Sequence, residues 1–212
     1  LERAVILNSA DFGITYISLL GGTVDEEYQK NVNSRYPGKY GSFAIGIYNG
    51  PGYHDIEVNS NKTIEGRLSI RPIPEKIPGL QIHYNNIYGQ GNLTKKNDFI
   101  SNTAAVSYES KNIVLMLQYM QGTGNSSGSY TDSLFNSYYN AGYSAFTEFS
   151  IPKTKLKLFG RYDYHELDNE SGIISNRGIF GLAYHFYKRN KIVLDCDIFD
   201  RNDLDETINF YE

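Results

Sequence analysis

The sequence predicts an all-β fold, an antiparallel up-and-down transmembrane β-barrel of about ten strands. Three observations lead to this prediction. Apolar and polar residues alternate along most of the chain, and the connections between the alternating segments are short and long in turn. Tyrosine is unusually abundant, with 19 Tyr and 11 Phe among 212 residues and no Trp. Successive side chains of a strand point to opposite faces, so a period of two indicates strands, and tyrosine suits a boundary between water and lipid.

The stretch KTIEGRLSIRPI, residues 62–73, shows the alternation most clearly. Ile64, Leu68 and Ile70 share one face, whereas Glu65 and Arg67 lie on the other. In an outer-membrane barrel the apolar face meets lipid and the charged face lines a water-filled lumen. In chain order, further strands are predicted over residues 39–50, 80–89, 99–109, 112–121, 154–165, 176–186 and 191–200. Residues 21–38 lack clear alternation and leave room for one short helix.

The connections between these segments alternate in length. The short ones cover residues 74–79, 110–112, 152–154 and 187–190, and the long ones cover residues 50–61, 89–97, 122–136 and 165–175. A single-chain outer-membrane barrel has tight turns at its periplasmic end and wide loops at its outer end. We therefore expect all the short turns at one end of the sheet.

Composition excludes several functional classes. The formal net charge of −4 and the lack of a basic stripe predict no nucleic-acid partner. A single cysteine, Cys196, excludes an internal disulfide and a cysteine-based zinc site, and the four histidines lack metal-ligand spacing. The sequence contains no run of about 18 apolar residues, so no transmembrane helix is predicted. We predict no cofactor and no metal site.

Four segments resemble the phosphate-selective porin O/P-like family of outer-membrane porins, and the resemblance runs thinly over most of the chain. The segments are LERA…SADFGITY (residues 1–16), GSFAIGIYNGPG (41–52), GRLSIRPIP…IPGLQIHYNNIYGQG (66–91) and IFGLAYHFYKRNKIVLDCDIFDR (179–201). This resemblance implies a bacterial outer-membrane channel, usually a trimer of barrels. It also implies a longer chain, so we expect residues 1–212 to be a single barrel domain, the C-terminal part of a larger barrel, incomplete at both ends.

The predicted function is passive diffusion of small hydrophilic solutes or ions, not catalysis. Outer-membrane lipid, lipopolysaccharide and two further copies in a homotrimer are the expected partners. Arg67 and Arg71 are expected to stack on one lumen wall about 13 Å apart at ~3.3 Å per residue. Lys155, Lys157 and Arg161 would form a second basic ladder, which leaves an anion preference open. The complete set of expected pore-lining residues is Glu65, Arg67, Arg71, Lys155, Lys157, Arg161, Asp163, Arg177, Asp195 and Asp197.

Two other functional classes stay open at this point. The first is a soluble or surface-exposed β-sandwich that binds a partner through tyrosine-rich loops, such as an adhesin. The second is an outer-membrane barrel enzyme centred on His165, with Glu166 and Asp168 in the same short stretch. The acidic stretch of residues 200–206 also offers oxygen ligands for Ca²⁺, although it lacks the glycine of an EF-hand loop.

Overall fold

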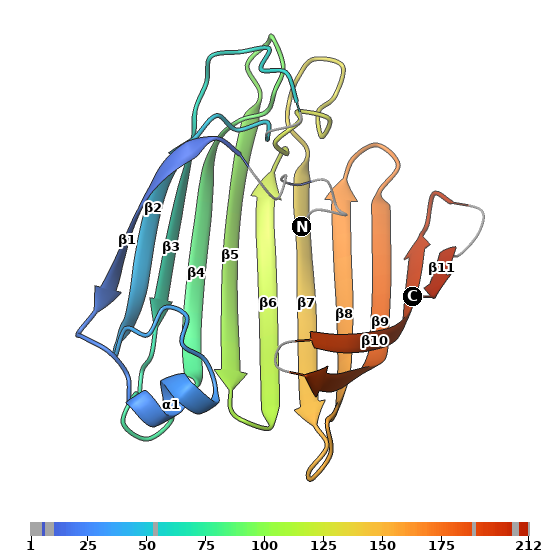
Figure 1. The fold of residues 1–212 in the computed structure, drawn as a ribbon. Helices are drawn as coiled ribbons and strands as arrows, with labels where there is room; N and C mark the ends of the chain where they lie inside the picture. Colours follow the sequence, from blue (N-terminus) through green and yellow to red (C-terminus); the bar gives the residue numbers. More distant parts are fainter. Residues whose placement is uncertain (1–5, 7–10, 53–54, 188–189, 205–207, 212) are drawn as a thin grey trace.

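The protein folds into one antiparallel sheet whose strands follow one another in sequence order (Figure 1). The computed structural model describes residues 6, 11–52, 55–187, 190–204 and 208–211, the last four by backbone alone. The eleven strands are β1 (Gly13–Leu20), β2 (Gly41–Tyr48), β3 (Thr63–Ile70), β4 (Leu80–Gln90), β5 (Asp98–Glu109), β6 (Ile113–Thr123), β7 (Tyr139–Ser150), β8 (Leu156–Asp168), β9 (Ile173–Tyr187), β10 (Asn190–Arg201) and β11 (Ile208–Tyr211). The prediction of an all-β, up-and-down antiparallel architecture is confirmed.

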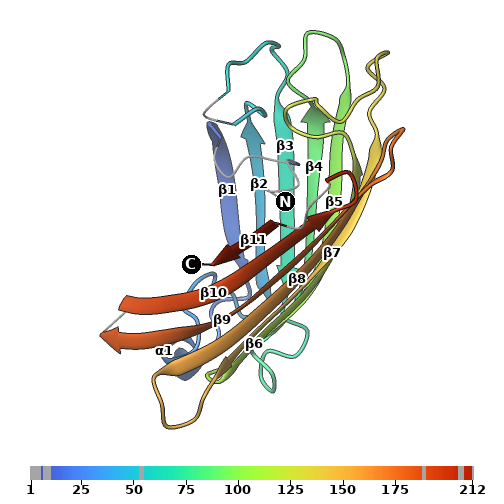
Figure 2. The same ribbon diagram turned by 90° about the vertical axis from the view of Figure 1, so that its right-hand side faces the viewer.

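The sheet curls but does not close. Figure 2 shows β10 and β11 in front of β1–β5, with β6–β9 forming the bend between them. Within the described residues, β1 and β11 are the two edges and do not pair with each other. Thr15 of β1 and Gln118 of β6 line the same cavity although five strand positions separate them. The face that carries both side chains is therefore the concave one. The described strands form a single sheet, so the two-sheet sandwich is not the architecture observed.

The register of the sheet climbs steadily from β2 to β10. A row of directly paired residues starts at the first residue of β2 and ends at the ninth residue of β10. The row is Gly41, Ile70, Ile82, Val106, Leu117, Ala145, Tyr162, Gly178 and Ile198. Eight steps between strands thus shift the row by eight residues. At ~3.3 Å per residue and ~4.8 Å between strands, this stagger corresponds to a strand tilt of about 35°.

Long and short connections lie at opposite ends of the sheet, as the alternation of lengths predicts (Figure 1). Two of the described connections depart from this arrangement: residues 169–172 form a short connection at the long-loop end, and residues 21–40 form a long one at the short-turn end, which carries the one described helix, α1 (Glu26–Asn31). Asp25 caps this helix by accepting a hydrogen bond from the backbone N–H of Tyr28. The long loop predicted over residues 165–175 is wrong, because β8 continues to Asp168 and only residues 169–172 connect it to β9.

The convex face is apolar and uncovered. Alternation also predicts that Leu156, Leu158, Leu182 and Leu194 point outward, and Leu156 and Leu182 lie on the convex face half-buried. Ile64, Leu68, Ile70, Leu158 and Leu194 lie on this face and are between 39% and 64% exposed. They belong to a set of exposed side chains that all project from the same face of the sheet: Ile14, Ile45, Ile47, Ile82, Tyr84, Tyr88, Val106, Leu115, Leu117, Tyr119, Tyr143, Tyr162, Phe180, Tyr184 and Ile192. The opposite, concave face holds a small apolar cluster of Ile6, Ile87, Phe99 and Met120.

Candidate functional site: the charged concave face

Eight of the ten residues expected to line a pore belong to strands and lie on the concave face. Strand alternation and register place Glu65 and Arg67 of β3 on the same face of the sheet as six charged residues of β8, β9 and β10. These are Lys157, Arg161 and Asp163 on β8, Arg177 on β9, and Asp195 and Asp197 on β10. The alternation that the sequence displays therefore identifies the face of these eight side chains.

Arg71 does not fit the predicted ladder with Arg67. It follows the last residue of β3 and is only 2% exposed. Its guanidinium donates to the backbone carbonyl oxygens of Pro78, Gly38 and Tyr36 at 2.8, 2.8 and 3.3 Å. The period of two no longer applies beyond the strand end, so Arg71 fastens the connection of residues 21–40 to the turn after β3. Its prediction as a pore-lining residue is wrong.

Lys155 also lies outside its predicted ladder. It precedes the first residue of β8, and its Nζ donates to the backbone carbonyl of Phe186 at 3.3 Å. This contact holds the amine against the end of β9, so Lys155 belongs to the turn end of the sheet. Lys157 and Arg161 remain on the concave face of β8.

Most concave-face cations are paired with a neighbouring carboxylate. Lys157 Nζ lies 2.5 Å from Glu148 Oε1 of β7, and Arg161 Nε lies 2.8 Å from Asp163 Oδ2. Arg177 makes a two-pronged contact with Asp197, with Nε–Oδ1 at 2.8 Å and Nη2–Oδ2 at 2.5 Å. A cation beside an anion attracts distant anions far less than a free cation does. Lys157 and Arg161, the two members of the predicted β8 ladder that lie on the concave face, therefore each have a carboxylate partner, and one of these partners, Glu148, is outside the predicted set.

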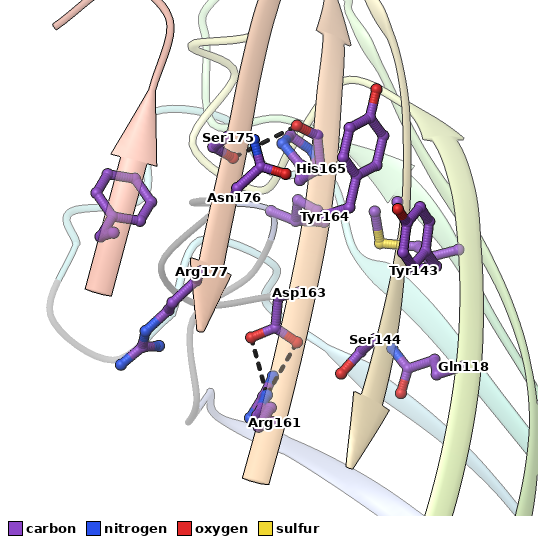
Figure 3. Close-up of a pocket in the computed structure, with 14 residues that line it drawn as sticks. Gln118, Tyr143, Ser144, Arg161, Asp163, Tyr164, His165, Ser175, Asn176 and Arg177 are labelled. Atoms are coloured by element: carbon purple, nitrogen blue, oxygen red, sulfur yellow. Dashed lines mark hydrogen bonds and ion pairs between the residues drawn. The ribbon is translucent and has the colours of Figure 1, made fainter. Parts of the chain in front are cut away.

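The larger cavity lies on the concave face of β6–β10 and has a volume of about 550 Å³ (Figure 3). Figure 3 shows the Arg161–Asp163 pair next to Ser144 and Gln118, with Arg177 on the adjacent strand. His165 also lines this cavity, and its ring stacks on Tyr130 with ring centroids 6.3 Å apart. The cavity wall thus offers paired charges, amides and hydroxyls.

The second cavity, of about 450 Å³, lies between β1 and β6 on the same face. Glu65 and Arg67 project into it, and the residues paired with them on β2 are the small Gly46 and Ala44. The ring of Tyr48 packs over Gly46, where an added Cβ would come within 2.5 Å of it, and forms one wall. Further polar lining comes from Asn85, Asn86, Ser101, Thr103 and Gln118.

Tyr36 covers the short-turn side of this second cavity. Its ring lies 4.3 Å from the guanidinium carbon of Arg67, which is a cation–π distance. Tyr36 has a φ of 48°, a left-handed conformation that is unusual for a bulky residue and requires support from its surroundings. Part of that support is the hydrogen bond that its carbonyl accepts from Arg71. The cavity thus combines residues from β1–β6 with one from the connection of residues 21–40, a contact that sequence periodicity does not reveal.

The described residues contain no cluster of three or more His, Cys, Asp and Glu side chains suited to a metal ion. In the acidic stretch, Arg201 pairs with Asp203 at 2.5 Å, and Asn202 bonds the backbone of Gly172 and Ile174. Residues 205–207 lie outside the described part of the chain. Nε2 of His165 is buried without a hydrogen-bond partner in the described structure, so no described carboxylate bonds this atom.

Hydrogen bonds lower the pKa values of two carboxylates outside the strands, Glu75 and Asp132. At the short-turn end, the ion pair with Lys39 at 2.9 Å lowers the pKa of Glu75. In the loop before β7, hydrogen bonds from the side chain and backbone of Asn136 lower the pKa of Asp132 below 3.8. Both carboxylates are therefore ionised at neutral pH, and Asp132 organises the loop around it.

Comparison with known proteins gives no family assignment, because no family model, curated protein or solved structure matches this chain. In the part of the chain that the structure describes, none of the helical residues form a segment long and apolar enough to cross a membrane.

Proposed function

We propose that this chain forms the wall of a transmembrane β-barrel in a bacterial outer membrane, through which small hydrophilic solutes diffuse passively. The observation that carries the proposal is the uncovered apolar convex face, since soluble proteins rarely expose a contiguous apolar patch of more than a few hundred Å². Leu117 and Leu194 are each 64% exposed, and the eight charged strand residues expected to line a pore occupy the opposite face. This distribution of apolar and charged side chains is the one that lipid outside and water inside would require.

The positions of the aromatic residues give further support. Outward tyrosines of β4, β6, β7 and β8 lie six to eight residues from the short-turn ends of their strands and so come to similar heights: Tyr88, Tyr119, Tyr143, Tyr162 and Tyr164. A second group lies near the short turns: Tyr108, Phe149, Tyr184 and Phe186. Aliphatic side chains such as Leu117 and Leu158 lie between them. Two aromatic girdles around an aliphatic band mark the two interfaces of a membrane.

Hydrogen bonds of the upper tyrosines fit the same interpretation. The hydroxyl of Tyr162 donates to Asn176 at 2.8 Å, and that of Tyr164 donates to Glu166 at 2.8 Å. Both acceptors lie closer to the long loops than the rings do. Each ring therefore presents carbon to the apolar band and its hydroxyl to the polar side.

Closure of the barrel is part of the proposal. The stagger of about one residue per strand is what a closed barrel with strands tilted by 35–45° needs. In lipid the open edges of β1 and β11 require strand partners, because unpaired backbone groups there cost several kcal/mol each. The same proposal includes outer-membrane lipid and lipopolysaccharide as surroundings, a homotrimer as the assembly, and kinship with the porin family that the sequence resembles.

Conductance and ion selectivity of the full-length protein in planar bilayers test this function. We expect detergent-dependent solubility, stepwise conductance and a small reversal potential in a KCl gradient, because three of the four cations among the eight strand residues expected to line a pore are paired with carboxylates. Arg177→Gln exposes the charge of Asp197 and should shift the reversal potential towards cation preference, whereas Arg177→Gln with Asp197→Asn should return it towards that of the wild type. A protein that is soluble without detergent and produces no conductance steps would refute the proposal.

A further inference from the structure

Glu65 and Arg67 differ from the other charged pairs of the concave face. They project from β3 two residues apart, about 6.6 Å along the strand, yet they do not form an ion pair. Among the described residues, Nε of Arg67 is buried without a hydrogen-bond partner, and Glu65 has neither a hydrogen bond nor an ion pair. Three other pairs on this face, including Lys157–Glu148, are closed at 2.5–2.8 Å.

The surroundings of the two side chains hold them apart. The guanidinium of Arg67 stacks on the Tyr36 ring at 4.3 Å, and Tyr36 adopts its unusual φ of 48° in doing so. Half-buried charges without partners are costly in a protein, and such local conflicts are concentrated at functional sites. The cavity between β1 and β6 therefore keeps one carboxylate and one guanidinium available in the same space of about 450 Å³.

We propose that this cavity binds zwitterionic α-amino acids, with the ligand ammonium on Glu65 and the ligand carboxylate on Arg67. The inference rests on the proposed channel function and names a class of solute for it. In an α-amino acid the ammonium nitrogen and the carboxyl carbon are about 2.5 Å apart. With one charge-assisted hydrogen bond of about 2.8 Å at each end, the ligand spans about 8 Å between Glu65 and Arg67. This span is enough to bridge two side chains whose Cα atoms are about 6.6 Å apart. A ligand with one charge would leave either Glu65 or Arg67 unpaired.

The remaining lining fits the rest of such a ligand. Asn85 pairs with Arg67 across β3 and β4 and places an amide beside the carboxylate position. The small side chain of Ala44, which pairs with Arg67, leaves space for the ligand next to the guanidinium, and the Tyr48 ring, packed over Gly46, offers an apolar surface for the ligand side chain. Since the volume matches small-molecule sites in general, we expect broad acceptance of small side chains.

Ligand-observed saturation-transfer NMR on the full-length protein in detergent micelles tests the inference without requiring a channel. L-alanine should bind with a half-saturating concentration at least about tenfold lower than that of lactate, which lacks the ammonium, or L-alaninamide, which lacks the carboxylate. Equal binding of either analogue would overturn the proposal. This comparison uses the wild type alone and is independent of how any variant folds.

Variants provide the second part of the test. Glu65→Gln and Arg67→Gln should each weaken L-alanine binding about tenfold, whereas the exchange Glu65→Arg with Arg67→Glu should retain it, because the ligand can reverse its direction. Glu170→Gln and Lys111→Gln, outside the cavity, serve as matched controls. Wild-type binding in the two neutralised variants overturns the proposal. A protein that conducts but does not bind L-alanine refutes this inference alone, and one that binds it but does not conduct refutes the channel function alone.

Discussion

Arg71 shows how one side chain can hold a connection in place from a buried position. Its guanidinium satisfies three carbonyl oxygens that belong to two separate connections, and its carbon lies 5.9 Å from the ring of Tyr28 on α1. Buried carbonyls that lose such donors cost about 1–3 kcal/mol each when nothing replaces them. The residue therefore contributes to stability and not to the charge of the concave face.

This role predicts different outcomes for two neighbouring arginines. Arg71→Ala should lower the free energy of unfolding by about 2–4 kcal/mol, because several buried carbonyls lose a charged donor. Arg67→Ala should cost less, since Arg67 donates to no described carbonyl and loses chiefly its stacking on Tyr36. Urea unfolding of the detergent-solubilised protein, followed by the heat-modifiable shift on gels, measures both. A larger loss in Arg67→Ala would contradict this assignment.

The residue scale also shows the limits of prediction from sequence. Alternation identified the concave-face position of Glu65, Arg67 and the charges of β8–β10, because the period of two holds wherever a strand continues. It failed at Arg71 and Lys155, which lie just beyond strand ends. The ion pairs and the cavity around Tyr36 depend on register and on contacts between distant segments, and composition carries no signal for either.

At the scale of elements, strands were easier to predict than connections. In the stretch of residues 165–175, Asn169, Ser171 and Gly172 do form the connection, but the residues on either side complete β8 and β9 by pairing from His165–Ser175 to Leu167–Ile173. Pairing with a neighbouring strand thus determines where the connection begins and ends. No predicted segment covers strand β7 (Tyr139–Ser150), which is therefore missed, although the long loop predicted over residues 122–136 does precede it.

The loop before β7 is held by the Asp132 carboxylate, whose hydrogen bonds should weaken in acid. The Asp132 carboxylate accepts hydrogen bonds from the Asn136 side chain and from the backbone N–H groups of Leu134 and Asn136, each at 2.8 Å. These bonds lower its pKa below 3.8, so the stabilisation is complete above about pH 3.8 and is lost as pH falls through the lower folded-state value.

An NMR titration of the micelle-bound protein measures this response. The amide signals of Leu134 and Asn136 should move together with a midpoint below pH 3.8, and Asp132→Asn should abolish the movement. The exposed Asp55→Asn variant, remote in sequence, is the control. A midpoint above that of an unperturbed aspartate would show that the carboxylate does not hold the loop.

At the scale of the whole molecule, register carries more information than any single strand. A shift of one residue per strand places the start of β2 in line with the ninth residue of β10. Sequence patterns do not reveal this stagger, because each strand by itself is compatible with several alignments to its neighbour, provided that the apolar face is kept.

The stagger predicts the orientation of the strands in a membrane. Polarised infrared spectroscopy of the protein in aligned bilayers should report strands tilted by about 35° from the membrane normal. Strands lying close to the membrane plane would indicate a sheet adsorbed on the surface and would contradict the barrel. Oriented samples of the Arg177→Gln variant provide a control, because a change of charge in the lumen leaves the backbone register unchanged.

The paired charges of β7–β10 have a consequence for any solute that comes close to the concave face. Each ion pair, such as Lys157 with Glu148 or Arg177 with Asp197, is a fixed electric dipole on the concave face of the sheet. The field of such dipoles falls off faster with distance than that of a single charge, so it acts within a molecular diameter of the wall. Water there is oriented and hard to displace. A polar solute replaces that water with equivalent hydrogen bonds, whereas an apolar solute of the same size has none to offer. This face would therefore slow apolar molecules, and it would distinguish little between cations and anions.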